Sequence, residues 1–142
     1  MWKTELITDI KAPAQKIWEF LITPDMWVQV DPEHYVSVTY PEKQLTAGTK
    51  GKMKTEKSPA FTFKVVSVDA AKQETVTSSP IPAGALTLTK RLVPTKTGCR
   101  FEEEVVATGP FAGLFSKLFF EKQIKASLPA QHAAIKTYAE SN

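Results

Sequence analysis

The chain has 142 residues, of which 42% are hydrophobic and 23% are charged, and its formal net charge is +3. This length suits one domain over residues 1–142 with a substantial core, and the ordinary composition excludes a disordered chain. The 18 basic residues nearly balance the 15 acidic ones, which argues against a nucleic-acid-binding protein.

The chain begins with a pattern typical of a half-buried strand. Polar and apolar residues alternate over residues 2–11, with Ile7 as the exception. Pro13 then provides the fixed φ that suits a first helical turn, and Ile17, Phe20 and Leu21 supply an apolar stripe. Residues 24–30 form a second short helix in this interpretation, so two short helices follow the first strand.

The middle of the chain predicts six further strands separated by turns. They are expected at residues 35–40, 49–57, 60–68, 73–78, 86–93 and 99–107. Residues 79–84 contain two prolines and a glycine and are predicted to form the most rigid loop.

The C-terminal quarter predicts a long helical stretch over residues 111–138. Its early apolar residues, from Phe111 to Phe119, and its later ones, from Ile124 to Tyr138, lie about 130° apart on a helical wheel. Pro129 removes a backbone hydrogen bond as well. We therefore expect a break between Phe120 and Pro129, with the early part over a cavity mouth and the later part held by the sheet.

Several segments carry a resemblance to a known superfamily. They are residues 10–13, 17–21, 24–27, 31–32, 45–49 and 98–100. With them, the sequence resembles the helix-grip superfamily called START-like or SRPBCC, and within it the polyketide cyclase/dehydrase-like group. The resemblance implies an α+β fold in which a seven-stranded curved antiparallel sheet wraps around a long C-terminal helix. It also implies a ligand cavity between sheet and helix, but the fold alone does not specify the function.

Two charged residues fall on strand faces that are otherwise apolar. Glu103 shares a face with Phe101 and Val105, and Lys90 shares one with Leu88 and other leucines. If these faces line the cavity, burial raises the pKa of Glu103 and suits it to acid or base chemistry, with Lys90 as its partner. A shift of register by one residue is the alternative, and it turns both side chains to solvent.

The other candidate site residues are mostly aromatic or aliphatic. His132 lies on or beside the apolar stripe of the C-terminal helix, so it is either a core histidine or, with Glu103, a catalytic residue. The family resemblance places Trp27, His34 and Tyr35 near the cavity. The full set of expected ligand-binding residues is Trp27, Tyr35, Met53, Phe61, Phe63, Leu88, Lys90, Phe101, Phe115 and Leu128.

Signatures of cofactor and metal chemistry are absent from the sequence. It contains no GxGxxG, P-loop, HExxH, GxSxG or CxxC motif, and we expect neither a cofactor nor a metal. Cys99 is the only cysteine, which excludes an internal disulfide and favours a cytoplasmic location. No stretch reaches the ~20 apolar residues of a membrane span.

Two surface features have alternative interpretations. Lys50, Lys52, Lys54 and Lys57 are interpreted as a solvated strand face, with binding to an anionic membrane as the alternative. The uncharged run of residues 105–116, together with residues 80–84, is hypothesised to gate the cavity mouth. Ordinary packing against the sheet is the alternative.

Three functions remain open from the sequence. The first is binding of a hydrophobic small molecule that is aromatic, acyl or polyketide-like, by a monomer or weak homodimer. The second is a polyketide cyclase or dehydratase in which Glu103 or His132 moves protons. The third is a stress-response or helper interaction protein with a closed interior. An open cavity with both residues turned inward favours the second, and one with neither favours the first.

Overall fold

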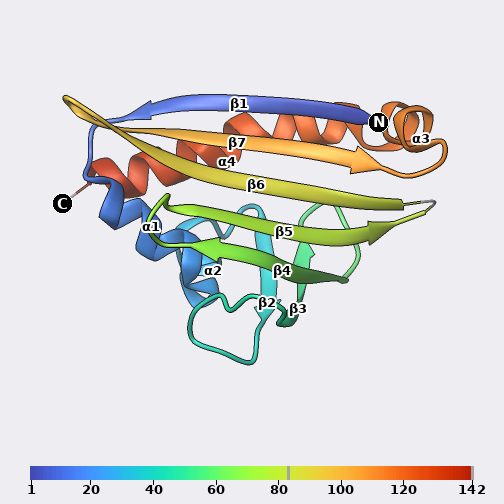
Figure 1. The fold of residues 1–142 in the computed structure, drawn as a ribbon, viewed down its shortest axis with the longest axis horizontal. Helices are drawn as coiled ribbons and strands as arrows, with labels where there is room; N and C mark the ends of the chain where they lie inside the picture. Colours follow the sequence, from blue (N-terminus) through green and yellow to red (C-terminus); the bar gives the residue numbers. More distant parts are fainter. Residues whose placement is uncertain (83, 142) are drawn as a thin grey trace.

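The computed structural model describes residues 1–82 and 84–141. Its elements in chain order are β1 (Trp2–Ile10), α1 (Ala14–Ile22), α2 (Pro24–Val30), β2 (Tyr35–Thr39), β3 (Lys50–Thr55), β4 (Phe61–Asp69), β5 (Glu74–Ile81), β6 (Gly84–Thr95), β7 (Gly98–Thr108), α3 (Ala112–Phe119) and α4 (Glu121–Glu140). The expected order of one strand, two short helices, six strands and C-terminal helix is confirmed (Figure 1).

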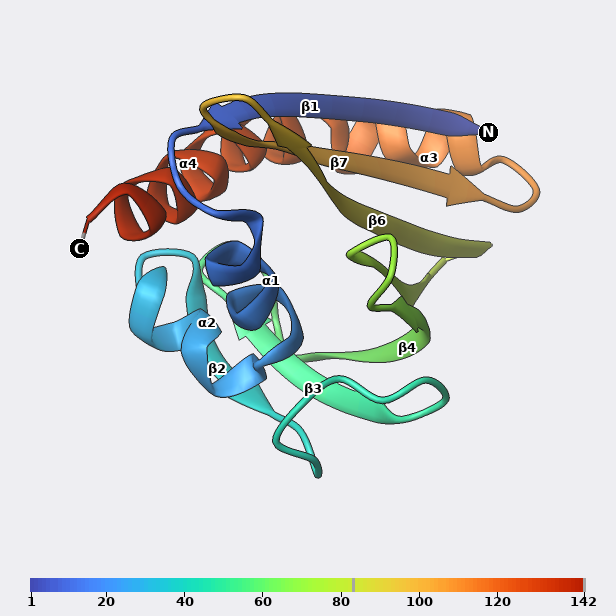
Figure 2. The same cartoon turned by 60° about the vertical axis from the view of Figure 1, so that its left-hand side comes forward.

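All seven strands form one antiparallel sheet in the order β1-β7-β6-β5-β4-β3-β2. The sheet curls from β1 through β6 and β4 to β3 (Figure 2), and α4 lies along β1 and β7 (Figure 1). Register shifts interrupt the pairing of β2 with β3 and of β4 with β5. Such irregularities bend strands locally, which suits a sheet that closes around a helix.

The largest part of the core lies where α1, α2 and the end of α4 meet the sheet. Phe20, Phe63 and Phe101 are almost fully buried there, together with Ile17 of α1 and Ile135 of α4. The buried stripe of α1 includes the three residues expected from the sequence. This end of the molecule is therefore filled with side chains, and free space is left towards the start of α4.

The connection after β5 is shorter than predicted. The sequence suggested a rigid loop over residues 79–84, but β5 continues to Ile81 and β6 begins at Gly84. Pro80 pairs with Ala85, and Ile81 pairs with Gly84. Cross-strand pairing thus continues almost to the hairpin tip. Proline is compatible with this pairing where its nitrogen does not have to donate a hydrogen bond to the neighbouring strand. Ala83 lies outside the described residues.

The break in the C-terminal helix is confirmed, at the first residue of the expected interval. Phe120 separates α3 from α4, with φ −114° and ψ −28°. Pro129 lies inside α4, so it does not end a helix. None of the helices within the described ranges combines the length and apolarity that a bilayer span requires.

The position of α3 differs from the expectation. It was expected to cover a cavity mouth, but it packs on β1 and β7. Its buried residues are the small Ala112 and Ser116, while the bulky residues of its other face are exposed. The small side chains allow a close approach to the strands that bulky ones would prevent, so the helix turns its apolar face outward.

Candidate functional site

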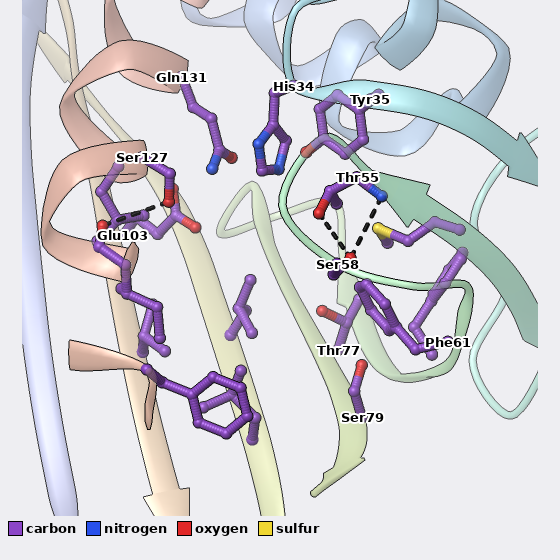
Figure 3. A pocket seen from close by; sticks show the side chains of 18 of the residues that line it. His34, Tyr35, Thr55, Ser58, Phe61, Thr77, Ser79, Glu103, Ser127 and Gln131 are labelled. Atoms are coloured by element: carbon purple, nitrogen blue, oxygen red, sulfur yellow. Dashed lines mark hydrogen bonds between the residues drawn. The ribbon is translucent and has the colours of Figure 1, made fainter. Parts of the chain in front are cut away.

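A cavity of about 320 Å³ lies between the concave face of the sheet and the first half of α4. Strands β3 to β7 contribute side chains that alternation turns inward, and α2 contributes Trp27. Figure 3 shows Phe61, Thr77 and Ser79 on one side and Ser127 and Gln131 of α4 on the other. Most of the exposed area inside is apolar, so the space suits an apolar molecule.

The structure brings most of the predicted ligand-binding residues together around this cavity. Those that line it are Trp27, Tyr35, Met53, Phe61, Phe63, Leu88, Lys90 and Leu128. Contact of these residues with a ligand stays a prediction.

Phe101 and Phe115 do not line the cavity, and their prediction is corrected. The Phe101 ring is completely buried in the core, and the imidazole of His132 stacks on it at a centroid distance of 4.4 Å. Phe115 belongs to α3, where its ring packs beside Phe119 at 4.8 Å and Phe120 at 5.4 Å. The rotation of α3 thus turns Phe115 away from the cavity, whereas Phe120 reaches its wall.

Glu103, in the cavity wall, and His132, behind it, form a buried hydrogen-bonded pair. His132 Nε2 lies 3.0 Å from Glu103 Oε1, and His132 Nδ1 lies 2.7 Å from the Thr8 hydroxyl. A carboxylate only accepts hydrogen bonds, so Nε2 carries the hydrogen and donates it. In the neutral imidazole Nδ1 then carries no hydrogen, and the Thr8 hydroxyl donates to it. Glu103 lines the cavity and His132 does not, so the histidine orients the carboxylate from behind.

One oxygen of Glu103 has no partner in the described part of the chain. Glu103 is 2% exposed, and its Oε2 accepts no hydrogen bond there. A buried acceptor without a partner is costly, so such an atom in a cavity wall indicates a place for a donor from a ligand or a water molecule. The free oxygen is therefore the most informative atom of the site.

Lys90 lies directly opposite Glu103 in the pairing of β6 with β7. Its side chain is half-buried, lines the cavity and has its Nζ 5.9 Å from the centre of the Trp27 ring. The alternative in which both side chains face solvent is therefore wrong. The two residues are cross-strand neighbours, but no direct ion pair joins them within the described residues. This leaves both groups able to meet a molecule placed between them.

The charges of the site shift each other's pKa values. Burial raises the pKa of Glu103, but the Lys90 charge and the hydrogen bond from His132 lower it more, so the net shift is downward. The expectation of a raised pKa is thus wrong, because it considered burial without these partners. Burial lowers the pKa of Lys90, and nearby Tyr35 and Glu103 reverse that shift. At neutral pH the site holds a carboxylate and an ammonium group.

His34 and Tyr35 close the same end of the cavity. Their rings meet edge to face at a centroid distance of 4.6 Å, and His34 and Gln131 point towards one another in Figure 3. Burial and the Lys90 charge lower the pKa of His34. Burial raises the pKa of Tyr35. Both are thus uncharged at neutral pH, so they offer hydrogen bonds and aromatic surface to a ligand.

Several polar wall residues were missed from the sequence. They are Thr55, Ser58, Thr75, Thr77, Ser79, Ser127 and Gln131. Alternation in β5 contained a signal for three of them, since Thr75, Thr77 and Ser79 share one strand face. Within residues 1–82 and 84–141, no group of three or more histidine, cysteine, aspartate or glutamate side chains is arranged to hold a metal ion.

The proposed gate at the mouth is only partly matched by the structure. Pro80, Ile81, Pro82 and Val105 line the cavity, but residues 105–108 belong to β7, and α3 packs on β1 and β7. The start of α4 meets the turn between β3 and β4, where the Gln123 side chain donates to the Lys57 carbonyl at 3.2 Å.

Asp31, close to this site, provides a test of the electrostatics. It is 6% exposed and its Oδ2 has no partner among the described residues. Burial raises the pKa of Asp31, against an opposing hydrogen bond from the His34 backbone. A carboxyl whose folded pKa exceeds its unfolded value destabilises the fold once ionised, and this penalty is absent in acid. Asp31→Asn is therefore expected to raise the free energy of unfolding by about 1 kcal/mol at neutral pH.

Urea unfolding tests this effect when it is measured once at neutral pH and once at a pH below 3.8, the ordinary pKa of the carboxyl group. The gain from Asp31→Asn should shrink in acid, and Asp9→Asn, at an exposed position, should change little at either pH. A loss of stability at neutral pH would show instead that the Asp31 charge is favourable where it stands.

Comparisons with known proteins agree with this architecture. A family model described as "Polyketide cyclase / dehydrase and lipid transport" matches residues 1–140. Norcoclaurine synthase from Thalictrum flavum superposes with a TM-score of 0.79 at 16% identity, over 99% of this chain and 94% of that one. Ara h 8.0201 gives a TM-score of 0.74 at 16% identity, over 99% of both chains.

A third solved structure is that of the di-domain ARO/CYC BexL from the BE-7585A biosynthetic pathway. Its TM-score is 0.78 at 13% identity, over 96% of this chain and 46% of that one, so this chain corresponds to about half of its length. At these identities the similarity shows a shared fold. No curated protein matches the sequence.

Proposed function

The chain belongs to the polyketide cyclase/dehydrase and lipid transport family, and from this membership and its cavity we propose that it binds a hydrophobic small molecule. The observation that carries the proposal is the apolar cavity of about 320 Å³, within the range of small-molecule sites. A helper protein with a closed interior is disfavoured by this open space.

The proposed ligand has a flat or chain-like apolar body and one oxygen-bearing group. Trp27, Phe61 and Leu88 supply apolar wall for the body. Lys90 donates to the ligand oxygen, and the free Oε2 of Glu103 accepts a hydrogen bond from a hydroxyl at the same place. A phenol, an enol or a hydroxylated acyl chain satisfies both groups.

A pair of aromatic probes tests this proposal. The wild-type protein should bind 2-naphthol about tenfold more tightly than naphthalene, because the hydroxyl meets two charged groups. Lys90→Met should remove most of that preference and leave the affinity for naphthalene nearly unchanged. Isothermal titration calorimetry measures both affinities.

Lys64→Met is the matched control, since Lys64 is exposed on β4 outside the cavity. It should keep the wild-type preference for 2-naphthol. Equal affinities of the wild-type protein for the two probes would contradict the polar end of the site, and no affinity for either would contradict the cavity as a binding site.

A second candidate function is proton transfer on a carbonyl compound, of the kind that a cyclase or dehydratase needs. It is favoured by the buried carboxylate of Glu103, a residue of the cavity wall: His132 binds one of its oxygens, and the other has no partner among the described residues. In this mechanism Glu103 takes a proton from the carbon beside a carbonyl, and the Lys90 ammonium stabilises the enolate oxygen. His132 acts as a positioning residue, because it does not reach the cavity.

The location, the oligomeric state and the partners of the protein are proposed as well. A cytoplasmic location fits the lone cysteine, Cys99, which is free and buried. A monomer or weak homodimer is proposed. Nucleic-acid partners are not expected, because basic and acidic residues nearly balance. Neither a metal nor a cofactor is required for the proposed binding or for the proton transfer.

A further inference from the structure

The helix α3 presents its bulky apolar face to solvent. Phe111, Leu114, Leu118 and Phe119 have exposed fractions of 78%, 62%, 67% and 64%. Single exposed apolar residues are common, but four large ones within nine positions form a contiguous patch of the kind that marks an interaction site. We call these four residues the α3 patch.

The backbone before α3 places one of these rings at the tip of the patch. Phe111 adopts φ 61° and ψ 10°, a left-handed conformation that is uncommon for a bulky residue. Its ring is the most exposed of the four. Burial of the ring would compensate for this backbone strain, but the ring is exposed. The strained conformation therefore indicates a function for the exposed ring.

The α3 patch adjoins the mouth of the cavity. Phe120, the residue after α3, lines the cavity, and so do Gln123 and Ile124 in the first turn of α4. Gln123 also contacts the turn between β3 and β4 through the Lys57 carbonyl. An apolar molecule that leaves the cavity by this mouth therefore emerges beside an exposed apolar surface.

The charges around the α3 patch are mainly positive. Lys117 of α3 and Lys122 in the first turn of α4 are both exposed. Glu121 is the nearby acidic residue of α4, and its carboxylate is paired with Lys125 at 3.2 Å. Apolar and aromatic side chains flanked by lysines are the composition of helices that lie in the interface of anionic bilayers.

From these observations we propose that the α3 patch and its lysines dock the protein on an anionic phospholipid membrane, with the cavity mouth at the bilayer surface. A second copy of the chain is a poorer occupant, because a symmetric pairing through α3 would bring the lysines of both copies together. The proposal goes beyond ligand binding and holds for a protein with an empty cavity. The bulky face is exposed in this structure because its partner is the bilayer.

Vesicle sedimentation tests the proposal with the whole chain. The wild-type protein should sediment with phosphatidylcholine vesicles that contain phosphatidylserine, and much less with phosphatidylcholine alone. Leu114→Gln/Leu118→Gln should weaken binding by at least about tenfold, because the apolar area that enters the acyl region is lost. Lys117→Gln/Lys122→Gln should weaken it by roughly fivefold for each lysine, and added salt should do the same.

Matched controls carry the same changes elsewhere. Ile7→Gln/Val66→Gln removes two apolar residues that are 52% and 51% exposed on strands β1 and β4. Lys72→Gln/Lys96→Gln removes two exposed lysines from turns at the end of the molecule opposite α3 (Figure 1). Both controls should bind vesicles as the wild-type protein does.

Hydrogen exchange gives a readout that does not depend on the variants. Amides of residues 111–119 should gain protection when phosphatidylserine vesicles are added. The proposal is overturned if the wild-type protein does not bind these vesicles, or if Leu114→Gln/Leu118→Gln binds them normally. It is also overturned if the wild-type protein is a stable dimer that this variant converts to a monomer, because the patch then serves a second copy.

Discussion

Thr77→Trp is expected to weaken the binding of 2-naphthol on the order of 100-fold, which corresponds to ~2.7 kcal/mol. Thr77 lies in the middle of the cavity wall, where it pairs with Leu88, another wall residue. An indole at this position fills a large part of the cavity of about 320 Å³, which leaves less space for a ligand. The same space admits the indole without displacing the core, so the fold should be retained.

Thr87→Trp is the matched control for this variant. Thr87 lies on the neighbouring strand β6, and alternation turns it to the opposite face from Leu86 and Leu88. Calorimetric titration should show wild-type affinity for Thr87→Trp, and circular dichroism should show folded proteins in both cases. If Thr77→Trp binds 2-naphthol as tightly as the wild-type protein, the probe binds outside this cavity.

Glu103→Gln is expected to slow proton exchange on 1-phenyl-2-propanone by on the order of 100-fold or more, if the protein catalyses it. In the proposed mechanism the Glu103 carboxylate accepts the proton from the benzylic carbon, and the amide of glutamine is not a base. Exchange in D2O replaces the benzylic hydrogens by deuterium, which proton NMR follows directly. The affinity for the ketone should change by less than about threefold, because glutamine has nearly the same shape.

The pH dependence of this exchange has a defined sign. A general base acts when ionised, and the pKa of Glu103 is held below its ordinary value of 4.5 by Lys90 and His132 despite the opposing effect of burial. The part of the rate that depends on Glu103 should therefore persist from neutral pH to below 4.5 and fall only in stronger acid. Because its folded pKa is lowered, the ionised Glu103 carboxylate stabilises the fold above the unfolded pKa, and this contribution is lost as pH falls through the lowered pKa.

Glu102→Gln is the control, because Glu102 is the neighbouring carboxylate on the outer face, where Arg91 and Arg100 bind it. It should exchange the ketone at the wild-type rate. A wild-type rate for Glu103→Gln would exclude Glu103 as the base. If the wild-type protein gives no exchange above the uncatalysed rate, binding without proton transfer on this ketone is the function that remains.

Local sequence pattern predicted the parts of the site that depend on strands. Period-two alternation placed Glu103 and Lys90 on inward faces, and the antiparallel hairpin between them fixed their register. Alternation also placed Phe61, Phe63 and Met53 on the inward side, where they line the cavity. These side-chain orientations could be predicted because successive side chains of a strand point to opposite faces of the sheet.

Features that depend on how a helix is rotated were not predictable in the same way. The apolar wheel of α3 suggested burial of Phe115 and its neighbours, but the small Ala112 and Ser116 contact the sheet instead. The bond between His132 and Glu103 joins residues 29 positions apart, and it depends on how α4 is seated across β7. The lowered pKa of Glu103 depends on that seating too.

The crystal structure of the complex with 2-naphthol tests the central claim most directly. Density for the naphthalene rings is expected between Trp27 and Leu88, with the hydroxyl oxygen within hydrogen-bonding distance of Lys90 Nζ and Glu103 Oε2. An unoccupied cavity at a probe concentration that saturates binding in solution, or density for the probe at another place, would contradict it.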